Sequence, residues 1–248
     1  MIKLSERMSA VAACVTPGLC VADIGCDHGY LPIYLVERKI APSAIAMDIK
    51  EGPLQAAREH IHRQGLEEKI KTRRSDGLTA LEPGEAQSVI IAGMGGRLAL
   101  KIVKDGEDFL NRTGDIREVI IQPQSELVLF RRGMQEMGFS CVQEDMVFED
   151  GKFYPLGRYL PAYVEKPSGM ESPENFLTID KDLAEEYGLW LLANRHPILK
   201  QYLEKEAKQL IQIRKSLGAM QDEQARQHRL QEVEEKMQKN ERARSFFA

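Results

Sequence analysis

Short, continuous apolar segments alternate with stretches of helical spacing through the first half of this chain. Continuous apolar strands are typical of a parallel sheet covered by helices on both faces, whereas a half-exposed strand alternates apolar and polar residues. The pattern therefore predicts right-handed β-α-β units and a mainly parallel sheet in an α/β fold. The expected strands are 19–24, 43–47, 70–74, 88–92 and 118–122.

The stretches between the strands carry helix signals. Ser5 is a possible N-cap for the first helix, Pro53 suits the first turn of another, and Gly65 stops that helix. The expected helices are 4–15, 30–38, 53–64, 98–110 and 126–137.

The pattern changes after Gly138. Residues 139–148 and 153–163 have strand character, and Glu149-Asp150-Gly151 between them is a strong hairpin signal. Five alternating units closed by an antiparallel hairpin predict the seven-stranded, Rossmann-like sheet of a class I methyltransferase, because an NAD-binding sheet usually ends in another parallel strand.

A second change comes at residues 165–173, a polar segment with two prolines and a glycine that we interpret as a linker. It separates an expected sheet domain, 1–164, from an expected α-helical coiled-coil domain, 165–248.

The coiled-coil domain is expected to be a hairpin of two antiparallel helices. Pro197 starts the first helix, a break falls at 218–221, and the tail 241–248 is expected to fray. Apolar residues keep the alternating steps of a coiled-coil seam, and Glu206 is the exception among them. The seam residues are Leu199, Leu203, Leu210, Ile213 and Leu217, and the matching stripe is Leu230, Val233 and Met237.

The net charge of −4 argues against a protein that binds nucleic acid mainly by electrostatic attraction. Local basic faces remain open, although such clusters are also typical of solvated helix faces. Lys and Arg cluster at 58–63, 69–74, 97–104 and 131–132.

Cysteine and histidine spacing gives no sign of a metal site. The four cysteines form no CxxC pair, and the five histidines lack metal-ligand spacing, so we predict no metal. No apolar run approaches a membrane span, and the first residues lack the apolar core of a signal peptide. We expect a reduced, monomeric, cytoplasmic protein.

The segment 23–29, DIGCDHG, follows the first expected strand. Gly25 lets the turn close and a ligand approach the backbone, and Asp23 can accept a hydrogen bond from the cationic amine of a methionine moiety. The spacing is GxDxG rather than GxGxxG, so a pyrophosphate would meet a carboxylate where it needs backbone amides. The motif favours S-adenosylmethionine over NAD, and a purely structural strand-to-helix turn is the alternative.

Two further acids end strands. Asp48, followed by Ile49, can bind both ribose hydroxyls of an adenosine, and Asp76, followed by Gly77, can accept from the exocyclic amine of adenine. Because the carboxyl ends of parallel strands share one edge of a sheet, we expect all four residues to bind the cofactor together with the first motif.

The fourth strand runs into Gly93-Met94-Gly95-Gly96. Methylases of the adenine amino group usually carry Asn or Asp there, then Pro-Pro and an aromatic residue that stacks on the base. The glycines instead leave space and free backbone amides, which favours a target other than the N6 amine. We expect Gly93 and Met94 to contact the cofactor and Gly95 and Gly96 to border the substrate; a tight crossover to the next helix is the alternative.

Asp27 and His28 are the candidates for the reaction centre. If the target is N1 of an adenine, that nitrogen has its own lone pair and needs no general base, so the protein would position the adenine and stabilise the resulting cation. Asp27 suits that role and is the candidate catalytic residue, with a helix N-cap as the alternative. We expect His28 to be a hydrogen-bonding group beside the cofactor rather than a catalyst.

The set LSERM, ADIGCDHGYLP, the DGL at Asp76, IAGMGG and IQPQ resembles the bacterial tRNA (adenine-22-N1)-methyltransferases. The resemblance spans about residues 4–164 and continues in general form through the helical tail. It implies a class I methyltransferase that transfers a methyl group from S-adenosylmethionine to N1 of adenine 22 in tRNA, with Arg7 and its neighbours bordering the RNA. Two motifs depart from the family pattern: AMDI stands where GE is usual, and IQPQ replaces QPN.

Two other functions stay open on the sequence. The protein could methylate a small molecule, with the helical tail closing over the substrate, and the low net basicity leaves room for this reading. It could also be a non-catalytic module whose helical hairpin binds a protein partner, although the set of strand-end acids weighs against that reading.

Overall fold

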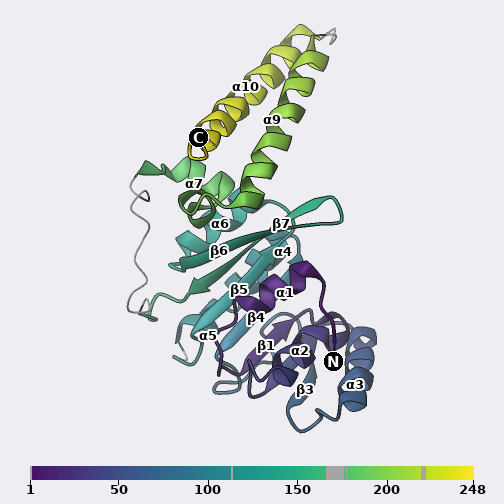
Figure 1. The fold of residues 1–248 in the computed structure, drawn as a ribbon. Helices are drawn as coiled ribbons and strands as arrows, with labels where there is room; N and C mark the ends of the chain where they lie inside the picture. The colour runs from purple at the N-terminus through teal and green to yellow at the C-terminus, as the bar shows by residue number, and fades with distance from the viewer. Residues whose placement is uncertain (1, 113, 166–175, 177, 219–221) are drawn as a thin grey trace. The chain divides into compact units, whose positions relative to one another are not determined.

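The computed structural model describes residues 2–112, 114–165, 176, 178–218 and 222–248 (Figure 1). The chain divides into two compact units, Met1–Met170 and Glu171–Ala248, which are described separately below. The predicted linker lies almost entirely outside the described residues, as does most of the predicted break at 218–221.

The first unit is built on a seven-stranded sheet in the order β3-β2-β1-β4-β5-β7-β6. Neighbours from β3 to β5 are parallel, and β7 pairs antiparallel with both β5 and β6. This order confirms the predicted class I methyltransferase sheet with its closing hairpin. The strands are β1 Val21–Ile24, β2 Ala44–Asp48, β3 Ile70–Arg74, β4 Ser88–Met94, β5 Glu118–Pro123, β6 Ser140–Glu149 and β7 Lys152–Leu160.

Helices cover both faces of this sheet. Apolar side chains of α1, α2 and α3 form one core with alternate strand residues such as Ile90 and Ile120, and those of α4, α5 and α6 form the other with Val89 and Ile121. The continuous apolar strands therefore supply both cores at once, as expected for parallel strands. The helices are α1 Glu6–Ala13, α2 Tyr30–Glu37, α3 Glu51–Gln64, α4 Gly96–Asp105, α5 Glu107–Arg112 and α6 Leu127–Glu136.

Several local signals act as predicted. The Ser5 side chain accepts from the Met8 amide and caps α1, and Gly65 ends α3 in the left-handed region. Asp150 and Gly151 both have positive φ, of 49° and 78°, in the two-residue turn between β6 and β7. This backbone is typical of the tight hairpin turns that Asp-Gly favours.

Two expectations in this unit are wrong. The single helix expected over 98–110 is two helices separated at Gly106, which lies so close to the Leu78 side chain that an added Cβ would crowd it. Arg131, expected in an exposed basic cluster, is buried and pairs with Glu144 through Nε at 3.0 Å. Arg131 of α6 can be buried because its charge is paired with Glu144 of β6, a contact that charge counting along the chain does not reveal.

The second unit consists of α7 Lys181–Tyr187, α8 Leu189–Ala193, α9 Pro197–Leu217 and α10 Glu223–Ser245. Figure 1 shows α9 and α10 side by side and antiparallel, and Leu210, Leu217 and Val233 form the core between them. Pro197 starts α9 as predicted. Ile213 is 39% exposed rather than part of the seam, and α10 continues through Ala243, which is fully buried, so the tail does not fray over 241–245.

A buried polar layer crosses this helical hairpin at Glu206, which is 6% exposed. Its carboxylate accepts from Tyr187 Oη at 2.8 Å, from Tyr202 Oη at 3.1 Å and from Asn240 Nδ2 at 3.0 Å. Asn240 also donates to the Leu203 carbonyl at 3.0 Å. A polar residue in an apolar seam is stable only when its hydrogen-bonding groups are satisfied, and here α7, α9 and α10 each contribute a partner.

None of the helices that the structure describes is long and apolar enough to cross a membrane.

Candidate active site

The carboxyl ends of β1, β2 and β4 meet at one edge of the sheet, where a cavity of about 450 Å³ opens. A ligand in an open α/β sheet binds at this edge, beside the point where the strand order reverses. Here that point lies between β1 and β4, on either side of which the chain crosses to opposite faces. The cavity is lined by Leu4, Arg7, Met8, Asp23, Gly25, Cys26, Asp27, Tyr30, Leu31, Asp48, Lys50, Pro53, Ala92, Gly93, Met94 and Gln124.

Asp23 is the most buried acid of this cavity. It lies in β1 between Ala46 of β2 and Ile90 of β4, and only 4% of its surface is exposed. Burial, together with the nearby carboxylates of Asp27 and Asp48, raises the pKa of its carboxyl group to about 7, and burial is the largest of these causes. None of the described residues donates a hydrogen bond to the Asp23 side chain. A buried carboxylate without a partner favours a cationic ligand.

Gly25 and Asp48 shape the floor of the cavity. Gly25 has a φ of 76°, and its amide donates to the Met47 carbonyl at 2.8 Å. The terminal methyl of Met94 lies directly over the Gly25 Cα, where a side chain on residue 25 would collide with it. Asp48 Oδ1 accepts from the Lys50 amide at 2.8 Å, which orients the carboxylate at the end of β2.

Three consecutive residues with positive φ form the turn after Gly25: Asp27 at 24°, His28 at 65° and Gly29 at 71°. Such a conformation costs on the order of 1–3 kcal/mol at a non-glycine residue and is often found at functional sites. The Asp27 side chain is 87% exposed, and its Oδ1 lies 3.3 Å from His28 Nε2. No side chain caps either this turn or α2, so Asp27 does not act as a helix cap.

A hydrogen-bond network joins α1 to the far wall of the cavity. The side-chain oxygen of the buried Gln122 accepts from Arg7 Nη1 at 2.9 Å and from the Gly93 amide at 3.2 Å. Arg7 also lies over the Tyr154 ring, 5.4 Å from its centroid. The first turn of α1 is held by Glu149 Oε1, which accepts from the Glu6 amide at 2.7 Å. Arg7 is therefore fixed at the cavity by contacts with β5 and the β6–β7 hairpin.

The structure does not bring all the predicted site residues into one cavity. Asp76 and Gly77 line a separate cavity of about 220 Å³ beside α4 and α5. Neither of these two cavities is lined by His28, Ile49, Gly95 or Gly96.

Gly96 is buried at the start of α4, where its amide donates to the Ser125 carbonyl at 3.1 Å and a Cβ would collide with that oxygen. This close contact supports the alternative interpretation of Gly96, in which the glycine allows a tight crossover from β4 to α4. Within the glycine-rich segment, Gly93 and Met94 are the residues that line the larger cavity.

Among the residues of the cavity or its wall that were not predicted as site residues, four carry a Tyr, Lys or Gln side chain. Tyr30 and Gln122 carry visible signals, because they belong to the GYLP and IQPQ segments that flank strand ends. Gln124 stands in the same IQPQ segment, and Lys50 follows Asp48 by two residues. Each is within a few residues of a predicted strand end, so a search of whole loops rather than of acids and glycines alone would have found them.

The described residues include no group of three or more His, Cys, Asp and Glu side chains that could hold a metal ion. The polar groups of the larger cavity include carboxylates at three positions, backbone amides, the guanidinium of Arg7 and the side chains of Tyr30, Lys50 and Gln124. It can bind a cationic amine and hydroxyl groups, and its glycine-lined wall can admit a planar group.

Comparisons with known proteins agree with this geometry. The profile of the family described as "Methyltransferase domain" matches residues 4–156. The Bacillus subtilis tRNA (adenine(22)-N(1))-methyltransferase is 39% identical over 155 residues, which span 62% of this chain and 64% of that relative, so the match covers a little less than two thirds of its length.

Two solved structures extend the similarity to almost the whole chain. The crystal structure of the B. subtilis M1A22 tRNA methyltransferase TrmK is 28% identical, with a TM-score of 0.83, and the comparison covers 98% of this chain and 100% of that one. A Streptococcus pneumoniae protein crystallised with S-adenosyl-L-methionine is 31% identical, with a TM-score of 0.79 and the same coverage. The chain therefore belongs to the methyltransferase domain family and, within it, to the group of the bacterial tRNA (adenine-22-N1)-methyltransferases.

Proposed function

We propose that this protein transfers a methyl group from S-adenosylmethionine to N1 of adenine 22 in tRNA. One observation carries the cofactor assignment: a buried Asp23, whose carboxylate lacks a recorded partner, lies with Asp27 and Asp48 at the strand ends. These acids fit a ligand with an ammonium, a sulfonium and a ribose, and they oppose one with phosphates.

The residues present fit that cofactor. Asp23 would accept from its amine, Asp48 would bind its ribose hydroxyls, and Gly25 and Gly93 would let it approach the backbone. Asp76 and Gly77 would bind its adenine from the separate cavity beside α4 and α5. When bound, S-adenosylmethionine supplies an electrophilic methyl group on its sulfonium.

On the substrate side, Asp27 and Arg7 line the part of the cavity that would meet the RNA. Methylation at N1 leaves a positive charge on the adenine, and the Asp27 carboxylate would stabilise that charge as it develops. Arg7, fixed by Gln122, would contact a phosphate or the base itself.

The RNA surface would draw on exposed basic side chains of α9. Two basic residues of the first unit, Arg73 and Arg97, pair with the acids Glu85 and Glu126. In α10, Lys239 pairs with Asp182. The basic residues of α9 are Lys200, Lys205, Lys208, Arg214 and Lys215. We further propose that the protein acts as a monomer in the cytoplasm.

The test incubates purified protein with isotopically labelled S-adenosylmethionine and unmodified tRNA, followed by mass spectrometry of the nucleosides. We expect 1-methyladenosine with wild-type tRNA and none with a tRNA that carries G at position 22. A product of 6-methyladenosine would contradict the N1 assignment, and labelling of a small molecule in place of RNA would favour the alternative substrate class.

A further inference from the structure

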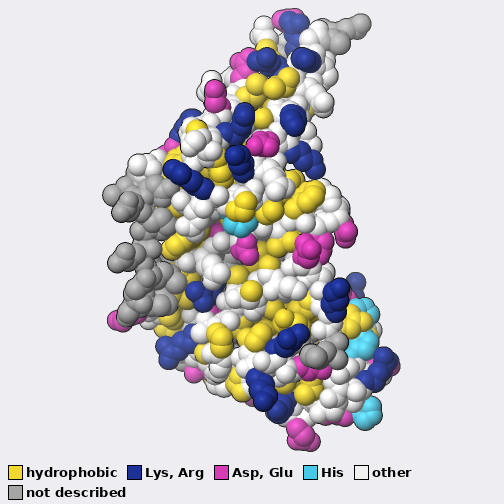
Figure 2. Space-filling view, viewed as in Figure 1, with side chains coloured by type: hydrophobic (Ala, Val, Ile, Leu, Met, Phe, Trp, Pro, Cys, Tyr) yellow, Lys and Arg dark blue, Asp and Glu magenta, His cyan; other side chains and the backbone are white. Residues whose placement is uncertain are grey.

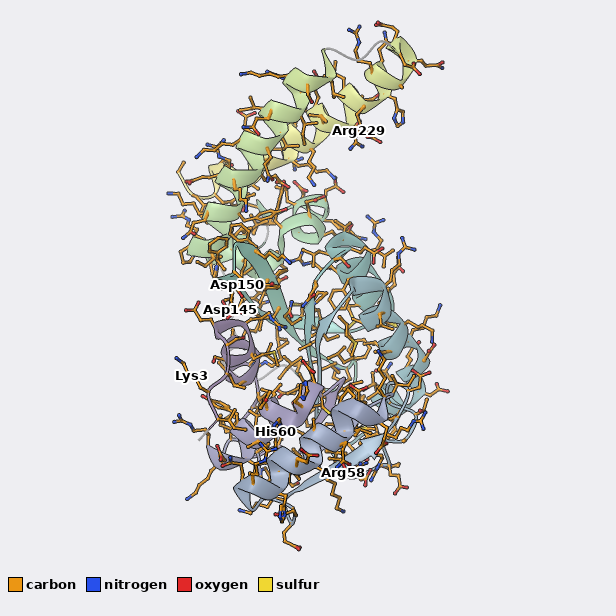
Figure 3. All side chains as sticks on the ribbon, turned by 90° about the vertical axis from the view of Figure 1, so that its right-hand side faces the viewer. Lys3, Arg58, His60, Asp145, Asp150 and Arg229 are labelled. Atoms are coloured by element: carbon orange, nitrogen blue, oxygen red, sulfur yellow. The ribbon has the colours of Figure 1, made fainter. Side chains whose placement is uncertain are left out.

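Three rings from two distant segments gather at the edge of the larger cavity. The Tyr30 ring stacks on the His60 ring of α3, with centroids 4.8 Å apart and an interplanar angle of 23°. The His28 ring lies 5.9 Å from Tyr30 and 6.0 Å from His60. Figure 2 shows a group of His side chains over α3, and Figure 3 labels His60 on that helix.

His60 also holds the backbone of the strained turn. Its Nδ1 lies 2.9 Å from the His28 carbonyl oxygen, and because a carbonyl oxygen can only accept, Nδ1 must carry the proton. One turn earlier on α3, Ala57 packs so closely on Gly29 that a Cβ on Gly29 would be 3.0 Å from the Ala57 Cβ. The turn with three positive φ angles is thus fixed to α3 at two points.

Among the described residues that line this cavity, Tyr30 is the one with an aromatic side chain. The ring is 43% exposed although it is stacked on one side, so part of its surface remains open. The wall formed by the end of β4 carries Gly93 and Met94, and the segment Gly93–Gly96 has no aromatic residue of the kind that adenine amino methylases use for stacking. A base that enters the cavity therefore has Tyr30 as its available stacking partner.

We propose that Tyr30 is the surface on which an unpaired adenine of the substrate RNA stacks, and that His60 is a positioning residue that holds Tyr30 and the Asp27–Gly29 turn in place. The inference rests on the proposed function, since it needs an RNA base as substrate. Base–aromatic stacking typically changes affinity by roughly 5- to 150-fold.

Variants of His60 can separate its ring stacking on Tyr30 from its hydrogen bond to the His28 carbonyl. His60→Asn keeps a donor at the position of Nδ1 and removes the stacked ring, whereas His60→Phe keeps the ring and removes the donor. We expect His60→Asn and Tyr30→Leu to raise the KM for tRNA about 10-fold. We expect His60→Phe to lower kcat about 10-fold with little change in KM, because the turn that carries Asp27 loses its anchor.

The matched control is His62→Phe, two residues along the same helix, where the side chain is 81% exposed and pairs with Glu67. Its kinetics should equal those of wild type. Affinity for S-adenosylhomocysteine, measured by calorimetry, should stay within about 2-fold of wild type in every variant. Parallel loss of cofactor affinity, or wild-type kinetics in Tyr30→Leu, would overturn the proposal.

Failure of the proposed tRNA activity can be distinguished from failure of this inference about Tyr30 and His60. If wild-type protein forms no 1-methyladenosine, the tRNA activity is wrong, and two direct measurements still decide this inference. Tyr30→Leu must then weaken binding of an adenine-rich RNA oligonucleotide, and His60→Phe, but not His60→Asn, must shift the backbone amide resonances of residues 26–30. Absence of either change contradicts the corresponding half of the proposal.

Discussion

Cofactor affinity should depend on pH through Asp23. Burial and two neighbouring acids raise the pKa of this carboxyl group to about 7 in the ligand-free protein. A cationic amine binds the carboxylate and not the neutral acid, so binding must first remove the proton. With a pKa of about 7, roughly three quarters of Asp23 is ionised at pH 7.5 and about 3% at pH 5.5. Affinity should therefore fall about 25-fold between these pH values, equivalent to about 2 kcal/mol.

The assay is isothermal titration of S-adenosylhomocysteine at half-unit steps between pH 5.5 and 7.5. At pH 6, binding should release close to one proton, which is measured by repeating the titration in buffers of different ionisation enthalpy. Asp23→Asn should bind weakly, and its remaining affinity should not vary with pH over this range. An affinity that is constant in the wild-type protein, or that rises as the pH falls, would refute the assignment of Asp23 to the amine.

The raised pKa of Asp23 also makes the stability of the protein depend on pH, which provides a control for the binding experiment. The unfolded carboxyl ionises near its ordinary value of 3.8 and the folded one near 7, so the folded state binds more protons between these values. Stability should therefore fall as the pH rises from about 4 to 7, by up to about 4 kcal/mol at 1.36 kcal/mol per unit. Asp23→Asn lacks this loss and should melt at a higher temperature than wild type at pH 8, which shows that its weak binding does not come from unfolding.

Three further predictions concern other residues. Asp48→Ala should weaken binding of S-adenosylhomocysteine about 10-fold, through loss of hydrogen bonds to the ribose, whereas unchanged affinity in calorimetry would mean that Asp48 does not hold it. Asp27→Asn should lower kcat for tRNA about 10-fold, or about 1.4 kcal/mol, as single-turnover rates at saturating cofactor can show. Glu206→Leu should destabilise the helical hairpin by roughly 2–4 kcal/mol in chemical denaturation, because Tyr187 and Asn240 lose their acceptor, whereas Glu204→Leu on the exposed face should change it little.

Much of the fold could be predicted because its signals are local. The strands of the parallel part of the sheet are short apolar runs that end in acids or turn residues, and the Asp150-Gly151 turn is encoded in two residues. The assignment to the methyltransferase family is confirmed by the family match and by the solved structures. Helix ends were less predictable: α4 and α5 are separated at Gly106, where a Cβ would collide with Leu78, 28 positions earlier in the chain.

Residue spacing predicted the candidate site only near strand ends, and Arg7 of α1 was named from the family resemblance instead. Asp23, Gly25, Asp27, Asp48 and Gly93 come together in one cavity because their strands are neighbours in the sheet.

Contacts between segments far apart in sequence could not be predicted. His60 faces His28 across 32 positions, and Gln122 accepts from Arg7 across 115. No spacing rule joins such pairs, since both depend on how a helix packs on the finished sheet. The exposure of Ile213 could not be predicted either, because it depends on how α9 is rotated about its own axis relative to α10.

The polar layer at Glu206 fixes how far each helix of the hairpin can slide along the other. A slide of one turn would carry Asn240 away from both the Leu203 carbonyl and the Glu206 carboxylate and would leave buried groups facing apolar side chains. Leucine-rich seams tolerate several such alignments at similar energy, and a single buried polar pair removes the degeneracy. The hairpin therefore has one permitted alignment, and the spacing between the charged side chains of its two helices is a fixed length that any partner of this surface must match.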